Sequence, residues 1–152
     1  MIQQLFLAFV LSSATVMIHA LGTVYAVIPA AGVWGRTFDG SNTFGTVMTL
    51  TRLVSALLVL HLLEMAAWAA AFVAAGVLPD FGTALYFSLK SYTTVGYGDV
   101  LPPESSRLLG PLEAAVGILM LGWSTGIIVA AVQRIYNSQP TVSTTTPRSP
   151  QG

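Results

Sequence analysis

The chain has 152 residues, no cysteine and a formal net charge of zero, with 8% charged and 54% hydrophobic residues. This length predicts one domain, and the lack of cysteine excludes disulfides and thiolate metal sites. About a quarter of the residues of an ordinary soluble domain are charged, so this composition is typical of a membrane protein. Nothing in the charge balance suggests nucleic acid as a partner, and no set of nucleophile, base and oxyanion donors indicates an enzyme.

The first apolar segment covers about residues 5–28, and a helix needs about 20 mostly apolar residues to cross a bilayer. No positive charge precedes this segment, so we expect a retained span and not a cleaved signal peptide. Pro29 favours the end of the helix, because proline lacks the N–H that would continue it. We therefore predict a transmembrane helix within residues 1–32 and a polar connector over residues 33–48.

Two further apolar segments predict membrane spans over residues 49–77 and 107–136. The sequence between them does not fit a crossing. Asp80 is a suitable N-cap for a helix over residues 80–92, which is too short to span, and residues 93–99 follow it directly. Irregular backbone at membrane depth is stable only where protein buries it or where it lines a water-filled cavity. We therefore expect a re-entrant half-helix that leads into a strand with its carbonyl groups facing a cavity.

The distribution of positive charge predicts the orientation of the chain. Four arginines belong to the first connector, the start of the second span and the C-terminal region: Arg36, Arg52, Arg134 and Arg148. Arg107 alone lies on the other side. The positive-inside rule therefore places the connector and the C-terminus in the cytoplasm and the N-terminus outside. Residues 137–152 are rich in Ser, Thr and Pro, a composition typical of a disordered tail.

The sequence TVGYG, from Thr94 to Gly98, is the most specific motif of the chain. Such a backbone can turn a row of carbonyl oxygens toward one axis and replace the hydration shell of a potassium ion. Gly96 and Gly98 allow backbone angles that residues with a Cβ rarely adopt. Val95 and Tyr97 are expected to point away from the axis. One such segment cannot enclose an ion, so the motif implies several copies around the axis.

With this motif and its setting, residues 52–136 resemble the pore module of the potassium channel superfamily: outer helix, pore helix, TVGYGD filter and inner helix. Residues 84–88 are similar to the pore helix of small bacterial two-helix channels. The module is assigned to residues 49–136, and residues 1–32 form an extra N-terminal helix. The resemblance implies an all-α membrane protein with three transmembrane helices per subunit, a re-entrant pore helix and a filter strand.

The same resemblance implies a homotetramer in a bacterial plasma membrane, surrounded by lipid and conducting K⁺ passively, with no organic cofactor. The expected K⁺ ligands are the carbonyl oxygens of Thr94, Val95, Gly96 and Tyr97, and Gly98 completes the motif. Thr93 and Asp99 flank the filter and are expected to support it. No span repeats arginine at every third residue, so a voltage sensor is not expected.

Lys90 stands on the pore helix four residues before the filter, where some prototype bacterial channels carry an acid that braces the filter aspartate. Here the charge is reversed. Lys90 is predicted either to pair with Asp99 or Glu113 and hold the filter rigid, or to extend its stem to water at the outer face.

His61 and Glu64 lie three residues apart, on one face of the second span. A buried ionisable pair in a membrane is a candidate pH sensor. The alternative is a structural hydrogen bond to the first span, through Ser12, Ser13 or His19. A metal site has less support, because the spacing gives only two ligands.

Gly122 matches the hinge glycine of the family's inner helix and is a candidate gating hinge. The alternative is close helix packing, for which small residues are common in membranes.

Two other functions remain open from the sequence. Distortion of the filter by Lys90 would give a nonselective or heteromeric cation channel subunit. The chain could also be the membrane subunit of a potassium transporter, although such transporters usually repeat a degenerate pore unit in one long chain.

Overall fold

The computed structural model describes residues 2–31 and 43–137. The predicted tail beyond residue 137 and residues 33–42 of the predicted connector lie outside the described residues. Within the described part, every regular element is helical, and three helical segments are long and apolar enough to cross a membrane. These segments are Gln4–Val27, Thr43–Ala74 and Glu104–Asn137. The prediction of an all-α protein with three spans and one short helix is confirmed.

The first span consists of α1 (Ile2–Gly22), a π-helical turn η1 (Thr23–Val27) and α2 (Ile28–Ala31). The prediction that Pro29 ends the helix is wrong, because Pro29 is the second residue of α2. The N–H of Ile28 donates to the carbonyl of Thr23, five residues earlier. This wide turn directly precedes the proline and relieves the clash that its ring causes in a regular α-helix.

The second span is α3 (Thr43–Ala74), which begins six residues earlier than predicted and ends three residues earlier. Its end is set by Gly76, whose φ of +66° is the left-handed conformation typical of a helix C-terminus. The N–H groups of Gly76 and Val77 donate to the carbonyls of Val73 and Phe72 and satisfy the end of the helix. The turn therefore closes α3 before the chain enters the short helix.

The short helix α4 runs from Phe81 to Tyr92. The Asp80 carboxylate caps it by accepting a hydrogen bond of 2.9 Å from the N–H of Thr83. After the filter segment come a 3-10 turn, η2 (Glu104–Ser106), and the third long helix, α5 (Leu109–Asn137).

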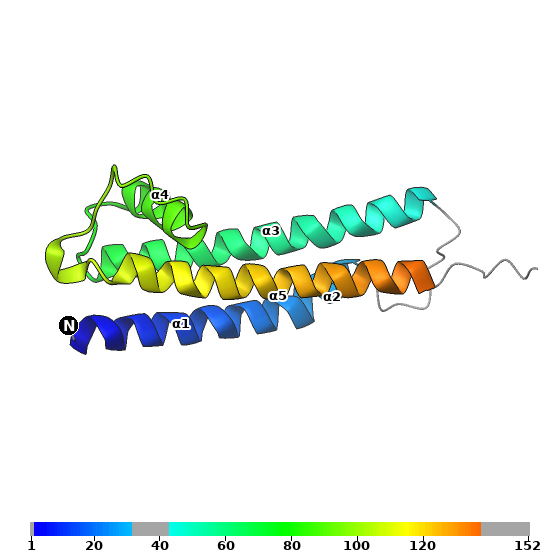
Figure 1. Ribbon diagram of the computed structural model, residues 1–152, viewed down its shortest axis with the longest axis horizontal. Helices are drawn as coiled ribbons and strands as arrows, with labels where there is room; N and C mark the ends of the chain where they lie inside the picture. The colour runs from blue at the N-terminus through cyan, green and yellow to red at the C-terminus, as the bar shows by residue number, and fades with distance from the viewer. Residues whose placement is uncertain (1, 32–42, 138–152) are drawn as a thin grey trace, which may run out of the picture.

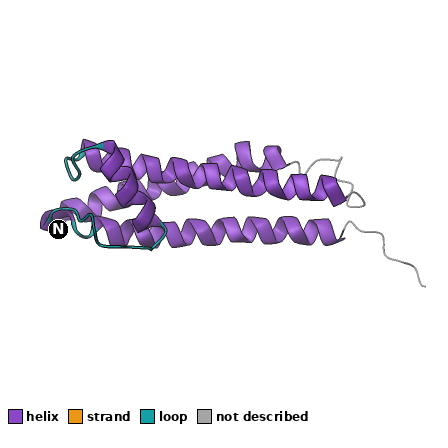
Figure 2. Ribbon diagram, turned by 90° about the horizontal axis from the view of Figure 1, so that it is seen from above, coloured by secondary structure: helices purple, strands orange, loops and turns teal. Residues whose placement is uncertain are grey.

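The three long helices lie side by side along the long axis of the molecule, and α4 lies near one end of them (Figure 1). The N-terminus and the loops on either side of α4 share this end, whereas α5 ends at the other (Figures 1 and 2). Both α1 and α4 pack against α3 and against α5. The pair α3–α5 is therefore the framework that holds the N-terminal helix and the short helix.

Gly117 lies where α5 passes the end of α4. A Cβ at this position would stand 2.2 Å from the carbonyl oxygen of Tyr92, which is a backbone atom and cannot rotate away. A Cβ at Gly122 or Gly126 would meet no atom of the described chain within 4 Å. Close packing within the subunit therefore explains Gly117 and does not explain the other two glycines.

We predict that Gly117→Ala lowers the free energy of unfolding by about 1–3 kcal/mol, since the backbone of α4 must move to admit the methyl group. Thermal unfolding of the purified protein in detergent measures this loss. Gly122→Ala is the matched control, and it should be neutral or more stable by up to about 1 kcal/mol, because alanine favours the helix. Equal melting temperatures for the two variants would contradict the prediction.

Candidate functional site

The filter segment has an alternating backbone. Thr94, Gly96 and Gly98 have φ values of +62°, +54° and +76°. Thr94 is the only non-glycine residue with positive φ in the described chain, so the residues between these three have negative φ. This alternation is incompatible with a β-strand, in which φ is negative throughout. The predicted filter strand is therefore an irregular segment, and it is one in which successive carbonyl groups can turn to the same side.

Backbone hydrogen bonds fix the start of the filter to the end of α4. The N–H of Thr94 donates to the carbonyl of Ser91 at 2.9 Å, and the N–H of Gly96 donates to that of Lys90 at 3.1 Å. Thr93 closes the helix, with its hydroxyl 2.6 Å from the carbonyl of Leu89. The partial negative charge at this helix end therefore lies next to Thr94, where it favours cations.

Lys90 is buried, and its ammonium group binds the carboxylate of Asp99 and the carbonyl of Val100, the latter at 3.1 Å. The hydroxyl of Tyr86 donates to the other oxygen of Asp99 at 2.6 Å. The Lys90 ammonium also lies 5.0 Å from the centre of the Tyr86 ring. Two side chains of α4 therefore hold Asp99 at the end of the filter, and the Lys90 head group contacts protein groups rather than extending to water.

These contacts change the ionisation of Asp99. Lys90 first, and Tyr86 second, lower the pKa of the Asp99 carboxyl from 3.8 to about 2. The hydrogen bond to Asp99 raises the pKa of Tyr86. Asp99 is therefore charged, and Tyr86 neutral, throughout the physiological pH range.

Glu113 does not contact Lys90, so the alternative pairing predicted for Lys90 is not the one in the structure. Glu113 is buried and accepts a hydrogen bond from the hydroxyl of Ser88, which also lies 2.8 Å from the carbonyl of Met65. Ser88 is two residues before Lys90 and faces another side of α4, which explains why the two charged groups do not meet. Glu113 thus joins α5 to α4, and Ser88 joins α4 to α3 at the same point.

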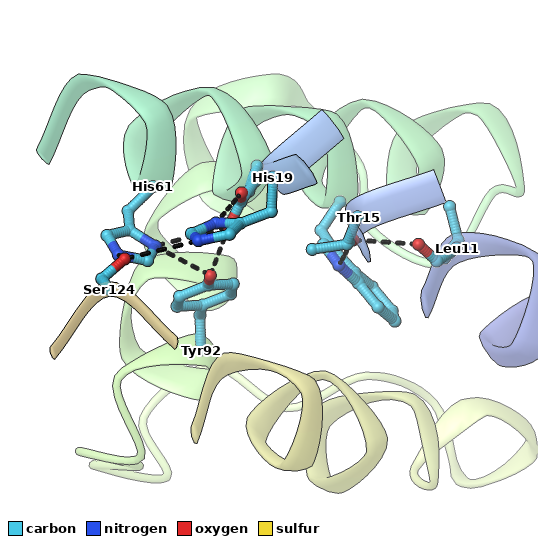
Figure 3. A network of polar contacts seen from close by, with 8 residues as sticks. Leu11, Thr15, His19, His61, Tyr92 and Ser124 are labelled. Atoms are coloured by element: carbon cyan, nitrogen blue, oxygen red, sulfur yellow. Dashed lines mark hydrogen bonds and ion pairs between the residues drawn. The ribbon is translucent and has the colours of Figure 1, made fainter. Parts of the chain in front are cut away.

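His61 and Glu64 lie together in a buried polar cluster, which we define as His19, His61, Glu64, Tyr92 and Ser124 (Figure 3). His19 Nδ1 is 2.8 Å from Glu64 Oε1, and His61 Nδ1 is 3.4 Å from Glu64 Oε2. The Tyr92 hydroxyl donates to Glu64 Oε2 and lies 3.0 Å from His61 Nδ1. Ser124 Oγ lies 2.9 Å from His61 Nε2 and 3.4 Å from His19 Nε2. The cluster therefore joins α1, α3, α4 and α5.

Of the three first-span partners predicted for this pair, His19 is the one that contacts Glu64. The hydroxyls of Ser12 and Ser13 donate to carbonyls one turn earlier in their own helix. Tyr92 and Ser124 did not appear among the sequence-predicted residues. Tyr92 could have been found, since a tyrosine buried beside the filter requires a partner for its hydroxyl. Ser124 has no local signal, because its role depends on how α5 packs.

A second polar contact joins α1 to α3 further along the same interface. The indole N–H of Trp68 donates to the hydroxyl of Thr15 at 2.8 Å, and both side chains are buried (Figure 3). The two helices are thus joined by two separate polar contacts.

Comparison with known proteins identifies the family. The model of an ion channel family matches residues 5–134, so the chain belongs to this ion channel family, which is not a family of enzymes. It is also similar to the TWiK family of potassium channels protein 18 of Caenorhabditis elegans, with 50% identity over 42 residues. That match covers 28% of this chain and 8% of the relative, so the chain spans a small part of its length. No solved structure matches.

We predict that Lys90→Met destabilises the protein in a pH-dependent way. The folded-state pKa of Asp99 is below its ordinary value, so the Lys90–Asp99 contact stabilises the fold fully above about pH 4 and loses this effect as the pH falls toward 2. The difference in melting temperature between the wild type and Lys90→Met should be largest above about pH 4 and should shrink below it.

The matched control is Arg107→Met, which removes an exposed pair with Glu104 that spans 3.5 Å. Such pairs contribute little, so its melting temperature should follow the wild type at every pH. A Lys90→Met effect that does not change with pH would show that only the packing of the lysine stem matters.

Proposed function

We propose that the chain is the subunit of a homotetrameric, potassium-selective channel that conducts K⁺ passively. The observation that carries the proposal is the alternation of positive φ at Thr94, Gly96 and Gly98 within the sequence TVGYG. This backbone follows the C-terminus of a 12-residue helix that is too short to cross a membrane. K⁺ selectivity by backbone carbonyls needs this combination of a carbonyl row and a supporting helix.

Several copies are needed because one filter segment offers ligands on one side of an ion only, and carbonyl filters for K⁺ are built from four. The exposure of the filter side chains supports assembly. In the single chain Val95 is 51% exposed and Tyr97 is 74% exposed, although both flank the proposed ion path. Side chains of this size are expected to pack against neighbouring subunits and hold the carbonyl groups in place. The proposed K⁺ ligands are the carbonyl oxygens of Thr94, Val95, Gly96 and Tyr97.

The contacts of Asp99 give the proposed outer mouth a rigid frame. Lys90 and Tyr86 bind its two carboxylate oxygens from the same helix, so the end of the filter cannot move without α4. Gly122 lies on the proposed pore-lining helix α5, and packing within the described chain does not explain it, so its proposed role remains that of a gating hinge. The name of the nematode relative also supports potassium as the permeant ion.

The direct test is ion flux through the purified protein in liposomes. We expect K⁺ flux that greatly exceeds Na⁺ flux and that barium blocks. Gly96→Ala should abolish selective flux, because a positive φ is strained for a residue with a Cβ, by about 1–3 kcal/mol. Gly126→Ala is the control, since it adds a methyl group within a helix, in open space.

Each result has a distinct meaning for the proposal. Equal flux of K⁺ and Na⁺ through the wild type would favour a nonselective channel. No flux at all from a folded tetramer would overturn the proposal that this chain conducts ions without another subunit. Persistent selective flux in Gly96→Ala would show that the ions do not pass along this backbone.

We further propose that the filter end of the molecule faces outward, in the plasma membrane. The natural chain has no cysteine, so single cysteines report orientation without background. A membrane-impermeant maleimide added to intact cells should label Ser105→Cys, near the filter end. It should label Asn137→Cys, at the end of α5, only after permeabilisation. The reverse pattern would invert the proposed topology.

A further inference from the structure

The polar cluster holds the side-chain types that bind transition metals. One ligand atom from each of His19, His61 and Glu64 lies within 4.8 Å of the other two, and all three residues are buried. Imidazole and carboxylate groups are typical zinc ligands, and a buried group of three with a further donor is the usual composition of such a site. The sequence spacing gives only two ligands, His61 and Glu64, and the fold places His19 beside them.

Tyr92 supplies the fourth donor. Its hydroxyl oxygen lies 3.0 Å from His61 Nδ1 and is hydrogen-bonded to Glu64. In a tetrahedral site with bonds of about 2.0–2.1 Å, neighbouring ligand atoms are about 3.3 Å apart. Three separations between Nδ1 and oxygen are 2.8 Å for His19 to Glu64 Oε1, 3.4 Å for His61 to Glu64 Oε2 and 3.0 Å for His61 to the Tyr92 hydroxyl. The ligand atoms of the two histidines and Glu64 lie within 4.8 Å of one another, so an ion would have to draw the wider pairs closer together.

We propose that His19, His61, Glu64 and Tyr92 form a binding site for a divalent transition metal of the Zn²⁺ or Co²⁺ type. The site would join three elements, with one ligand from α1, two from α3 and one from α4. It does not depend on the proposed potassium conduction, because no ligand belongs to the filter.

The hydrogen bonds of the cluster show how it can take an ion without gaining charge. Five hydrogen bonds form a closed ring through Glu64, His19, Ser124, His61 and Tyr92. With one proton in each hydrogen bond, the five side chains share five protons and together carry no net charge. When the Glu64 carboxylate, the Tyr92 phenolate and the two neutral imidazoles bind a metal, three of the five protons remain. Each imidazole keeps one, and the Ser124 hydroxyl keeps the third. One M²⁺ enters and two protons leave, so the buried site stays neutral.

Ser124 would then orient both imidazoles from behind. With both Nδ1 atoms on the metal, each ring carries its proton on Nε2, and both Nε2 atoms lie beside Ser124 Oγ, at 2.9 and 3.4 Å. Hydrogen bonds of this kind fix the tautomer of metal-bound histidines. Ser124 is therefore a positioning residue and not a ligand.

The experiment measures bound metal directly. The full chain, with a purification tag free of histidine, is produced in medium supplemented with Zn²⁺ or with Co²⁺, so that a buried site is filled as the protein folds. Elemental analysis should find about one metal ion per subunit. The Co²⁺ form should show the intense visible absorption of four-coordinate cobalt. Less than a tenth of an ion per subunit, or only the weak absorption of six-coordinate cobalt, would overturn the proposal.

Variants test which side chains hold the ion. His19→Gln and Glu64→Gln should each lower the bound metal at least tenfold, and Tyr92→Phe should alter the cobalt spectrum while leaving the helix packing intact. Thr15→Val is the matched control, because it removes the other polar contact between α1 and α3 without touching a ligand. Metal retained in His19→Gln, or lost equally in Thr15→Val, would contradict the assignment. The wild-type spectrum decides the question even if a ligand variant does not fold.

Discussion

At membrane depth, backbone N–H and C=O groups that lie outside a helix must find their hydrogen-bond partners within the protein. The short helix α4 and the filter after it face this constraint more than any other part of the described chain. The N–H groups of Thr94 and Gly96 meet it by donating to carbonyls at the end of α4, and polar side chains of α4 fix the helix itself through three different partners. Ser88 binds Glu113 of α5, Lys90 binds Asp99, and Tyr92 binds Glu64 of α3. Ser88 and Tyr92, four residues apart, share one face of the helix, whereas Lys90 points to the opposite side, so α4 is held from both sides.

Acidic side chains are costly groups in a membrane, and of the three that bind Ser88, Lys90 and Tyr92 of α4, two have several partners. A buried charge without a partner is strongly unfavourable, whereas a paired and hydrogen-bonded one is tolerated. Glu64 has two histidines and a tyrosine around it, and Asp99 has a lysine and a tyrosine. Glu113 is the exception, since one of its oxygens has no hydrogen-bond partner among the described residues.

Local signals made part of this structure predictable. Asp80 as the cap of α4 and the spacing of His61 and Glu64 depend on neighbouring residues, and the sequence shows both directly. The glycines of the filter likewise indicated positive φ. The positive φ of Thr94 could not be predicted, since no side-chain preference requires it. The ends of the spans were also missed, because a π-turn before Pro29 and a left-handed Gly76 decide them.

The choice between partners depended on tertiary packing. Lys90 had two candidate acids in the sequence, and only the direction of its side chain from α4 separates Asp99 from Glu113. In the same way, His19 contacts Glu64, and Ser124 contacts both histidines, only because α1 and α5 pack beside α3.

The contact between His19 and Glu64 also makes the N-terminal helix part of the shield around the Glu64 carboxylate. A shortened version that kept only the two helices around α4 would expose the Glu64 carboxylate to hydrocarbon, where ionised side chains are strongly disfavoured. Truncation alone would therefore give a poorly inserting protein. A minimal two-helix pore engineered from this chain would have to replace Glu64 and His61 with apolar residues in the same step, and Tyr92 with phenylalanine.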